Sequence, residues 1–132
     1  MLTLPFRYRG SQVLKNQSFL HRLAFAFNGI RSAWAQERSF RTQCVCALAM
    51  LVVLLALRPP LLWWALCLMS AALVLALELV NTALEQALDH LHPQQHAAVR
   101  IAKDCAAAAV LCASVAAAII GALTIAVALG AI

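Results

Sequence analysis

Apolar residues recur at helical spacing in the first ordered-looking stretch of the chain. Phe19, Leu23, Phe27, Ile30 and Trp34 follow one another at intervals of 4, 4, 3 and 4 residues, which is typical of one face of an α-helix. The basic and polar residues of this stretch fall mainly off that face. We therefore predict a helix over residues 18–35 with Ser18 as its N-cap, and a basic face opposite an aromatic one favours a position in a membrane interface.

Three longer apolar runs follow. The first lies before the helix-breaking sequence Arg58-Pro59-Pro60, the second starts there and continues helically past Glu78 to His92-Pro93, and the third follows Asp104. They predict membrane spans over about 40–57, over 61–80 with a cytoplasmic extension to 91, and over 104–130. Residues 1–17 are predicted to be an N-terminal tail, and 18–132 to be one domain.

Composition supports a membrane protein. Of the 132 residues, 64% are hydrophobic and only 11% are charged, with a mean hydropathy of +0.86. An average soluble domain has about 25% charged residues. This argues against a disordered chain, a basic nucleic-acid-binding domain and an ordinary soluble enzyme. The predicted fold class is all-α: three transmembrane helices and an N-terminal amphipathic surface helix.

Lysine and arginine are concentrated before the first span. Seven of the ten precede it, Arg58 lies in the first hairpin, and Arg100 and Lys103 lie in the second loop. Because cytoplasmic loops of membrane proteins are enriched in these residues, the N-terminus is expected in the cytoplasm and the C-terminus outside. The five cysteines have no regular spacing and are expected to act as small apolar residues.

Acidic residues number only five, and all are predicted near the cytoplasmic ends of the spans. Glu78, Asn81, Glu85, Asp89 and His92 are spaced 3, 4, 4 and 3 apart, so they share one helix face. Carboxylates four residues apart repel unless a cation lies between them. Mg²⁺ is a natural candidate because it binds oxygen ligands and phosphates. The alternative is a solvated helix end with counter-ions, for which Asp89 is the strongest case.

Other sites are less well supported. The chain has neither G-x-x-x-x-G-K-[ST] nor G-x-G-x-x-G, so a P-loop and a protein-kinase phosphate loop are not predicted. A non-enzymatic membrane module, such as an ion pathway, is a different class of function. The absence of charge from Pro59 to Leu77 argues against conduction.

Two motifs resemble a known family. The segment Glu78-Leu79-Val80-Asn81-Thr82-Ala83-Leu84-Glu85, with Asp89 after it and Ala102-Lys103-Asp104 further on, is similar to the prokaryotic diacylglycerol kinase family, which includes undecaprenol kinases. The stretch Glu37-Arg38-Ser39-Phe40-Arg41 is similar as well. The resemblance runs from about Phe19 to Gly121.

The resemblance implies a homotrimer in the bacterial cytoplasmic (inner) membrane, with no nucleic-acid partner. It implies transfer of the γ-phosphoryl group of MgATP to the hydroxyl of a membrane lipid. Diacylglycerol, giving phosphatidic acid, is the favoured substrate, and undecaprenol, giving undecaprenyl phosphate, is the alternative. A ridge of small residues in the third span, Ala109, Ala113, Ala117 and Gly121, favours helix association.

The resemblance also implies roles for individual residues. Glu78 would be the general base, supported by Asn81, and Glu37 and Glu85 would hold the metal. The nucleotide would contact Phe25, Glu37, Glu85, Gln94, Gln95, His96, Lys103 and Asp104. The lipid would contact Arg22, Arg31, Ser32, Ala33, Trp34 and Glu78. Ser18 stands where some members have an arginine, and Arg22 one turn later is a candidate to replace it.

Overall fold

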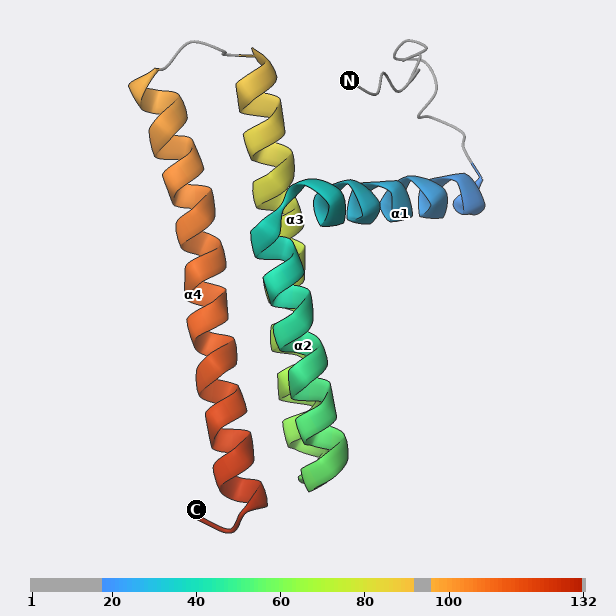
Figure 1. The fold of residues 1–132 in the computed structure, drawn as a ribbon, viewed down its shortest axis with the longest axis vertical. Helices are drawn as coiled ribbons and strands as arrows, with labels where there is room; N and C mark the ends of the chain where they lie inside the picture. The colour runs from blue at the N-terminus through green and yellow to red at the C-terminus, as the bar shows by residue number, and fades with distance from the viewer. Residues whose placement is uncertain (1–17, 92–95, 132) are drawn as a thin grey trace.

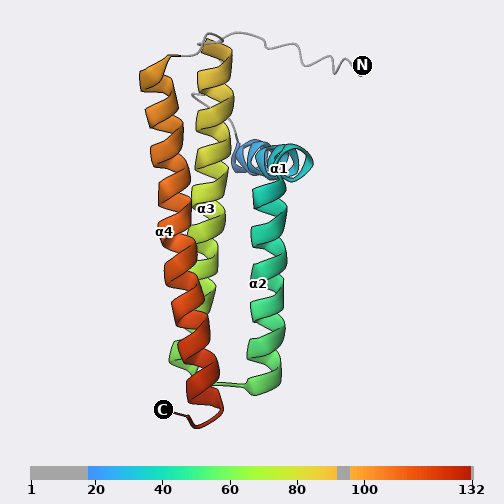
Figure 2. The same cartoon turned by 60° about the vertical axis from the view of Figure 1, so that its left-hand side comes forward.

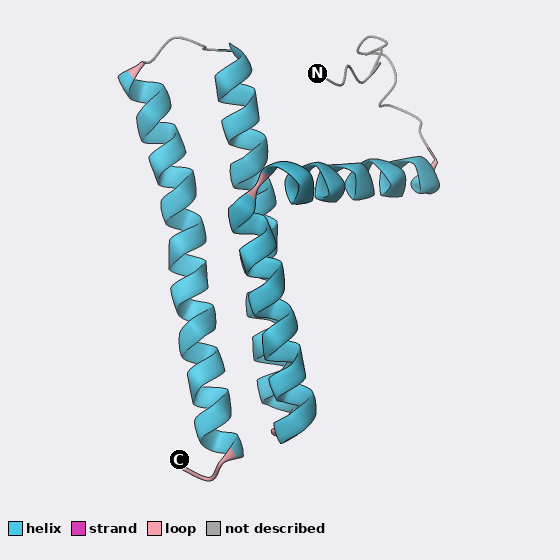
Figure 3. Ribbon diagram, viewed as in Figure 1, coloured by secondary structure: helices cyan, strands magenta, loops and turns pink. Residues whose placement is uncertain are grey.

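The described part of the chain is entirely helical apart from short connections (Figure 3). The computed structural model describes residues 18–91 and 96–131. They form α1 (Phe19–Gln36), α2 (Arg38–Leu57), α3 (Leu61–Leu91) and α4 (Ala97–Ala128). α1 lies crosswise to the other helices, which run side by side (Figure 1). The predicted tail over 1–17 lies outside the described residues.

The observed helices match the predicted boundaries with one informative difference. α1, α2 and α3 begin and end within two residues of the predicted limits. α4 begins at Ala97, well before the predicted start at 104, and ends at Ala128. The predicted start at Asp104 is the last charged residue before the third apolar run. Residues 97–103 contain no glycine or proline, so helical hydrogen bonding extends through them.

Two backbone breaks set the directions of the helices. Glu37 is extended (φ −105°, ψ 118°) and separates α1 from α2. Arg58 ends α2 in the left-handed region (φ 48°, ψ 55°), and two prolines follow it. A residue before proline is hindered in the right-handed helical region. Ser18 occupies the N-cap position as predicted, but its side chain makes no hydrogen bond to a backbone N–H of the described first turn. Its Oγ lies 3.1 Å from His21 Nδ1, within hydrogen-bond distance.

α3 and α4 are packed against each other along most of their length, and both views show them side by side (Figures 1 and 2). The apolar core is small and includes Leu54, Val74 and Val110. Many large apolar side chains are exposed, for example Leu48 at 62% and Leu111 at 64%. Because α2, α3 and α4 are long and apolar enough to cross a membrane, these side chains suit a lipid environment.

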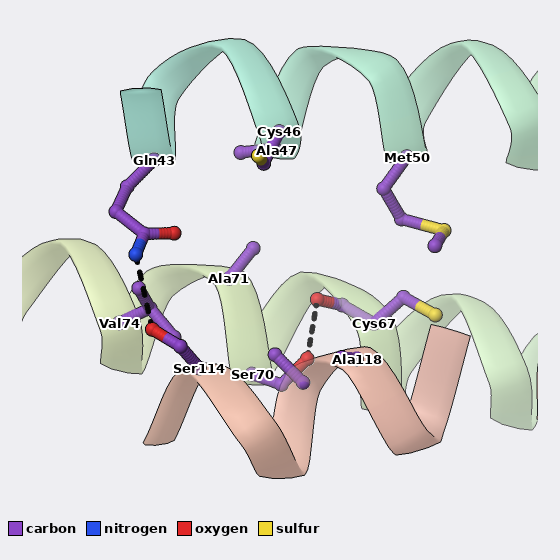
Figure 4. A pocket seen from close by; sticks show the side chains of 11 residues that line it. Gln43, Cys46, Ala47, Met50, Cys67, Ser70, Ala71, Val74, Ser114 and Ala118 are labelled. Atoms are coloured by element: carbon purple, nitrogen blue, oxygen red, sulfur yellow. Dashed lines mark hydrogen bonds between the residues drawn. The ribbon is translucent and has the colours of Figure 1, made fainter. Parts of the chain in front are cut away.

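Polar contacts join the spans where they face one another. Gln43 Nε2 donates to Ser114 Oγ at 3.0 Å, which joins α2 to α4 (Figure 4). These two residues line a cavity of about 290 Å³ between α2, α3 and α4.

Gly121 lies where α4 comes close to α2, because a Cβ at this position would lie 2.5 Å from Met50 Cε. The predicted small-residue ridge therefore serves, at Gly121, the approach of α4 to α2 within one chain.

Candidate functional site

Glu78 is the one charged residue that is buried among residues 18–91 and 96–131, with 2% of its surface exposed. Ser39, at the start of α2, donates a hydrogen bond from Oγ to Glu78 Oε2 at 3.0 Å. A buried carboxylate is costly without a polar partner. The contact therefore fixes one oxygen of Glu78 at the point where α1 and α2 meet.

Glu78 lies at the end of the uncharged part of α3, which we call the apolar layer where it would cross a membrane. α3 begins at Leu61, and a helix rises about 1.5 Å per residue, so Glu78 lies roughly 25 Å from the start of α3. A bilayer has a hydrocarbon core about 30 Å thick. The crosswise helix α1 meets α2 next to Ser39, while α3 continues beyond α1 (Figure 2). Glu78 thus lies level with the junction of the crosswise helix and the spans.

The next turn of α3 carries two polar atoms without partners. Asn81 Nδ2 donates to Glu85 Oε1 at 3.2 Å. Asn81 Oδ1 and Thr82 Oγ1 are buried, and neither has a hydrogen-bond partner among the residues that the structure describes. Most buried polar atoms in proteins are paired. Two unpaired oxygens beside a buried carboxylate are therefore free to bind a ligand.

The two predicted metal ligands lie on facing segments. Gln86 Nε2 donates to Gln36 Oε1 at 3.2 Å, so the chain around Glu37 runs alongside the turns of α3 that carry Glu85. Both carboxylates are partly buried. Within the described residues, no three His, Cys, Asp or Glu side chains are grouped closely enough to hold a metal. Mg²⁺ is commonly held by one or two carboxylates together with substrate phosphates, so these residues fit MgATP rather than a bare ion.

Asp89, whose role the sequence left open, forms an ion pair with Lys103 across α3 and α4. Asp104 instead forms an ion pair with Arg100 on the exposed face of α4, where Asp104 Oδ2 lies 3.8 Å from Arg100 Nε. Asp89 follows Glu78 by eleven residues, or about 16 Å along the helix. The acids of α3 therefore form a series leading away from the apolar part of the helix.

Two further predicted nucleotide contacts, His96 and Phe25, lie at the start of α4 and on α1. His96 is the N-cap of α4, and its Nδ1 accepts a hydrogen bond from Ala98 N at 3.2 Å. Gln94 and Gln95 lie outside the described residues. Phe25 is 47% exposed on α1.

Apart from Glu78 on α3, the predicted lipid contacts lie on α1, but in different surroundings. Arg22 and Arg31 are exposed, and no hydrogen bond or ion pair joins them to the described residues of α3. Ser32 and Ala33 line a cleft between α1 and α3. Trp34 is 49% exposed, and its carbonyl accepts a hydrogen bond from Arg41. Only Ser32 and Ala33 therefore face α3.

Residues 24–125 match the protein family described as prokaryotic diacylglycerol kinase. The chain belongs to this family. The resemblance inferred from Phe19 to Gly121 is thereby confirmed, and membership supports the assignment of the chain as a lipid kinase.

Three relatives named diacylglycerol kinase are similar over most of the chain. The protein of Synechocystis sp. is 38% identical over 118 residues, which cover 89% of this chain and 66% of the relative. The protein of Escherichia coli K12 is 33% identical over 95 residues (72% of this chain and 78% of the relative). That of Helicobacter pylori J99 is 33% identical over 89 residues (67% and 70%). The chain thus spans just under two thirds of the Synechocystis protein.

The structure adds site residues to which the sequence assigned no role. Ser39 contacts Glu78 although the two are 39 positions apart, and no local pattern indicates such a pair. Thr82 is buried, and its hydroxyl is unpaired among the described residues. The one sign of it in the sequence is its position directly after Asn81, which belongs to the polar helix face. The contact between Gln36 and Gln86 likewise depends on how α1 lies against α3.

Proposed function

We propose that this protein is an ATP-dependent lipid kinase that transfers the γ-phosphoryl group of MgATP to the hydroxyl of diacylglycerol, giving phosphatidic acid. The observation that carries the proposal is the buried Glu78, which sits at the edge of the apolar layer with a hydrogen bond from Ser39. The relatives named diacylglycerol kinase support this substrate. Undecaprenol is the second candidate, because it also presents a primary hydroxyl at the interface.

Glu78 is the proposed general base. Ser39 engages Oε2, and within the described residues no hydrogen bond is made to Oε1. Oε1 takes the proton of the lipid hydroxyl, the hydroxyl oxygen forms a bond to the γ-phosphorus, and the bond to the β–γ bridging oxygen breaks to release ADP. A base at this depth serves a substrate whose chains stay in the membrane. Proton transfer of this kind contributes about 10²- to 10⁴-fold to a rate.

Glu37 and Glu85 are the proposed ligands of the Mg²⁺ that accompanies ATP, and the unpaired Asn81 Oδ1 supports the reacting centre. Bound Mg²⁺ neutralises phosphate charge during phosphoryl transfer. Lys103, which pairs with Asp89, has the charge to contact a phosphate. Phe25, His96, Asp104, Gln94 and Gln95 are the remaining proposed nucleotide contacts.

The proposed setting is the bacterial inner membrane, with the N-terminus cytoplasmic and the C-terminus outside. In this arrangement α1 lies in the cytoplasmic interface, where its exposed Phe19 (75%) and Phe27 (62%) enter the lipid headgroup region. Arg22, Arg31, Ser32, Ala33 and Trp34 are the proposed lipid contacts. The proposed assembly is a homotrimer, in which neighbouring subunits complete the site.

The test is a phosphoryl-transfer assay on the purified protein in lipid-detergent micelles with labelled ATP and Mg²⁺. We expect labelled phosphatidic acid from diacylglycerol. Glu78→Gln should lower kcat by about 100-fold or more, because it removes the base. His90→Gln, an exposed change on the same helix, is the control. Failure to label any lipid while ATP binding is intact would contradict the proposal, and labelling of undecaprenol alone would select the second candidate.

A further inference from the structure

The cavity of about 290 Å³ between α2, α3 and α4 lies inside the part of the chain that is apolar enough to cross a membrane. Much of its wall is made of small side chains, with Ala47, Ala71 and Ala118 coming from one helix each (Figure 4). Of the described residues that line it, none is charged. Because protein interiors contain few voids larger than a water molecule, a space of this size indicates an occupant.

Both serines that line the cavity are hydrogen-bonded within the chain. Ser114 Oγ accepts a hydrogen bond from Gln43 Nε2 at 3.0 Å, and Ser70 Oγ donates one to Cys67 O at 3.0 Å. Cys67 Sγ also lies 3.2 Å from Thr124 Oγ1, within hydrogen-bond distance. Since a buried polar ligand needs free hydrogen-bond partners, an apolar occupant suits this cavity better than a polar one.

The register of α3 relates the cavity to the proposed base. Three lining residues precede Glu78 by four, seven and eleven positions, and so share its helix face: Val74, Ala71 and Cys67. A helix rises about 1.5 Å per residue, so this part of the wall extends from about 6 Å to about 16 Å from Glu78. It does so on the side of the apolar layer. A lipid whose hydroxyl reaches Glu78 therefore extends its chain toward the cavity.

The two ends of the cavity differ in a way that suits a chain entering from the bilayer. Cys46 of α2 and Ala118 of α4 line the cavity and are exposed, so it opens between these two helices. Its far end is bounded by Met50, where a Cβ on Gly121 would lie 2.5 Å from Met50 Cε. The far part of the wall is about 16 Å from Glu78, which is close to half of a hydrocarbon core about 30 Å thick.

We propose that this cavity binds one acyl chain of the lipid substrate, and that the small side chains of its wall determine which chain lengths are accepted. The chain enters between α2 and α4, and Met50 limits how far it reaches. This inference rests on the proposed lipid kinase function and adds to it a determinant of chain length, located in the spans.

The experiment compares kcat/KM for dioleoylglycerol with kcat/KM for dibutyrylglycerol, whose short chains end before the far part of the cavity. Ala71→Leu fills the cavity from α3. We expect the ratio of the long-chain to the short-chain value to fall about fivefold or more, which is the low end of the effect of overfilling a packed space. The loss should come mainly from a higher KM for dioleoylglycerol, with activity on dibutyrylglycerol retained.

Ala72→Leu is the matched control, because Ala72 is the next residue of α3, is exposed and is not among the described residues that line the cavity. It should leave the ratio unchanged. Ala117→Leu fills the same cavity from α4 and should lower the ratio as Ala71→Leu does. Ala116→Leu, at an exposed position of α4, is its control. This second pair keeps the test decisive if Ala71→Leu fails to fold.

The outcomes separate the two proposals. A parent protein that phosphorylates neither lipid overturns the kinase function and this inference with it. A parent protein that is active, but whose ratio is unchanged by both Ala71→Leu and Ala117→Leu, overturns the inference and leaves the kinase function standing. An equal loss on both lipids also overturns it, because the cavity would then serve folding or contact between subunits and not the chain of the lipid.

Discussion

Replacing Ser39 by alanine tests whether the contact between α2 and α3 holds the proposed base in place. The change removes the 3.0 Å hydrogen bond from Ser39 Oγ to Glu78 Oε2. A hydrogen bond to a charged group contributes about 1.5–3 kcal/mol. Ser39 is itself exposed, so we take the low end of that range. A loss of about 1.4 kcal/mol in the transition state corresponds to a tenfold lower kcat.

The assay is steady-state phosphoryl transfer with both substrates varied. We expect kcat to fall about tenfold and the KM values for MgATP and lipid to change little, because the hydroxyl of Ser39 orients Glu78 and is not assigned a substrate. Ser39→Thr keeps a hydroxyl and should restore most of the rate. Thr42→Ala, one turn along α2, removes a hydroxyl whose one hydrogen bond within residues 18–91 and 96–131 is to Arg38 O, and it should have little effect.

Two results would refute this reasoning. A kcat for Ser39→Ala within about twofold of the parent value would mean that the hydrogen bond does not position the base. A loss that Ser39→Thr fails to restore, accompanied by lower thermal stability, would mean that residue 39 acts through packing between α2 and α3.

Two further changes test the charged groups along α3 and α4. Glu85→Gln should raise the KM for MgATP by roughly tenfold, because one carboxylate ligand of Mg²⁺ is lost, and titrating Mg²⁺ during nucleotide binding checks this. An unchanged metal dependence would contradict the role of Glu85. Asp89→Asn should lower the free energy of unfolding by less than about 1 kcal/mol, because the Asp89 side chain is 66% exposed in its pair with Lys103. It should not raise the KM for ATP, because Lys103 is then free to contact phosphate, and a severalfold rise would argue against that contact.

Local sequence was sufficient for the helices. The stripe from Phe19 to Trp34, the break at Arg58-Pro59-Pro60 and the long apolar runs predicted all four helices, because periodicity and helix breakers act over one or two turns. The start of α4 was misplaced for a related reason: charge marks where a span leaves the apolar layer, whereas a helix ends where the backbone can no longer continue.

The candidate site was only partly predictable. Helical spacing put Glu78, Asn81 and Glu85 on one face, and the structure keeps them there. The pairing of Asp89 with Lys103 depends on how α3 packs against α4, and no spacing rule relates residues on different helices. Gln94 and Gln95 lie outside the described residues, so their predicted contact with the nucleotide is still a prediction.

Composition and local periodicity are enough to show that this chain is apolar, helical and suited to a membrane. Which polar groups are satisfied depends instead on how the helices pack. Packing gives Glu78 a donor from Ser39 and, among the described residues, leaves the Thr82 hydroxyl without a hydrogen-bond partner. Hydrogen bonding between helices depends on distances between segments far apart in the chain, and only packing sets those distances.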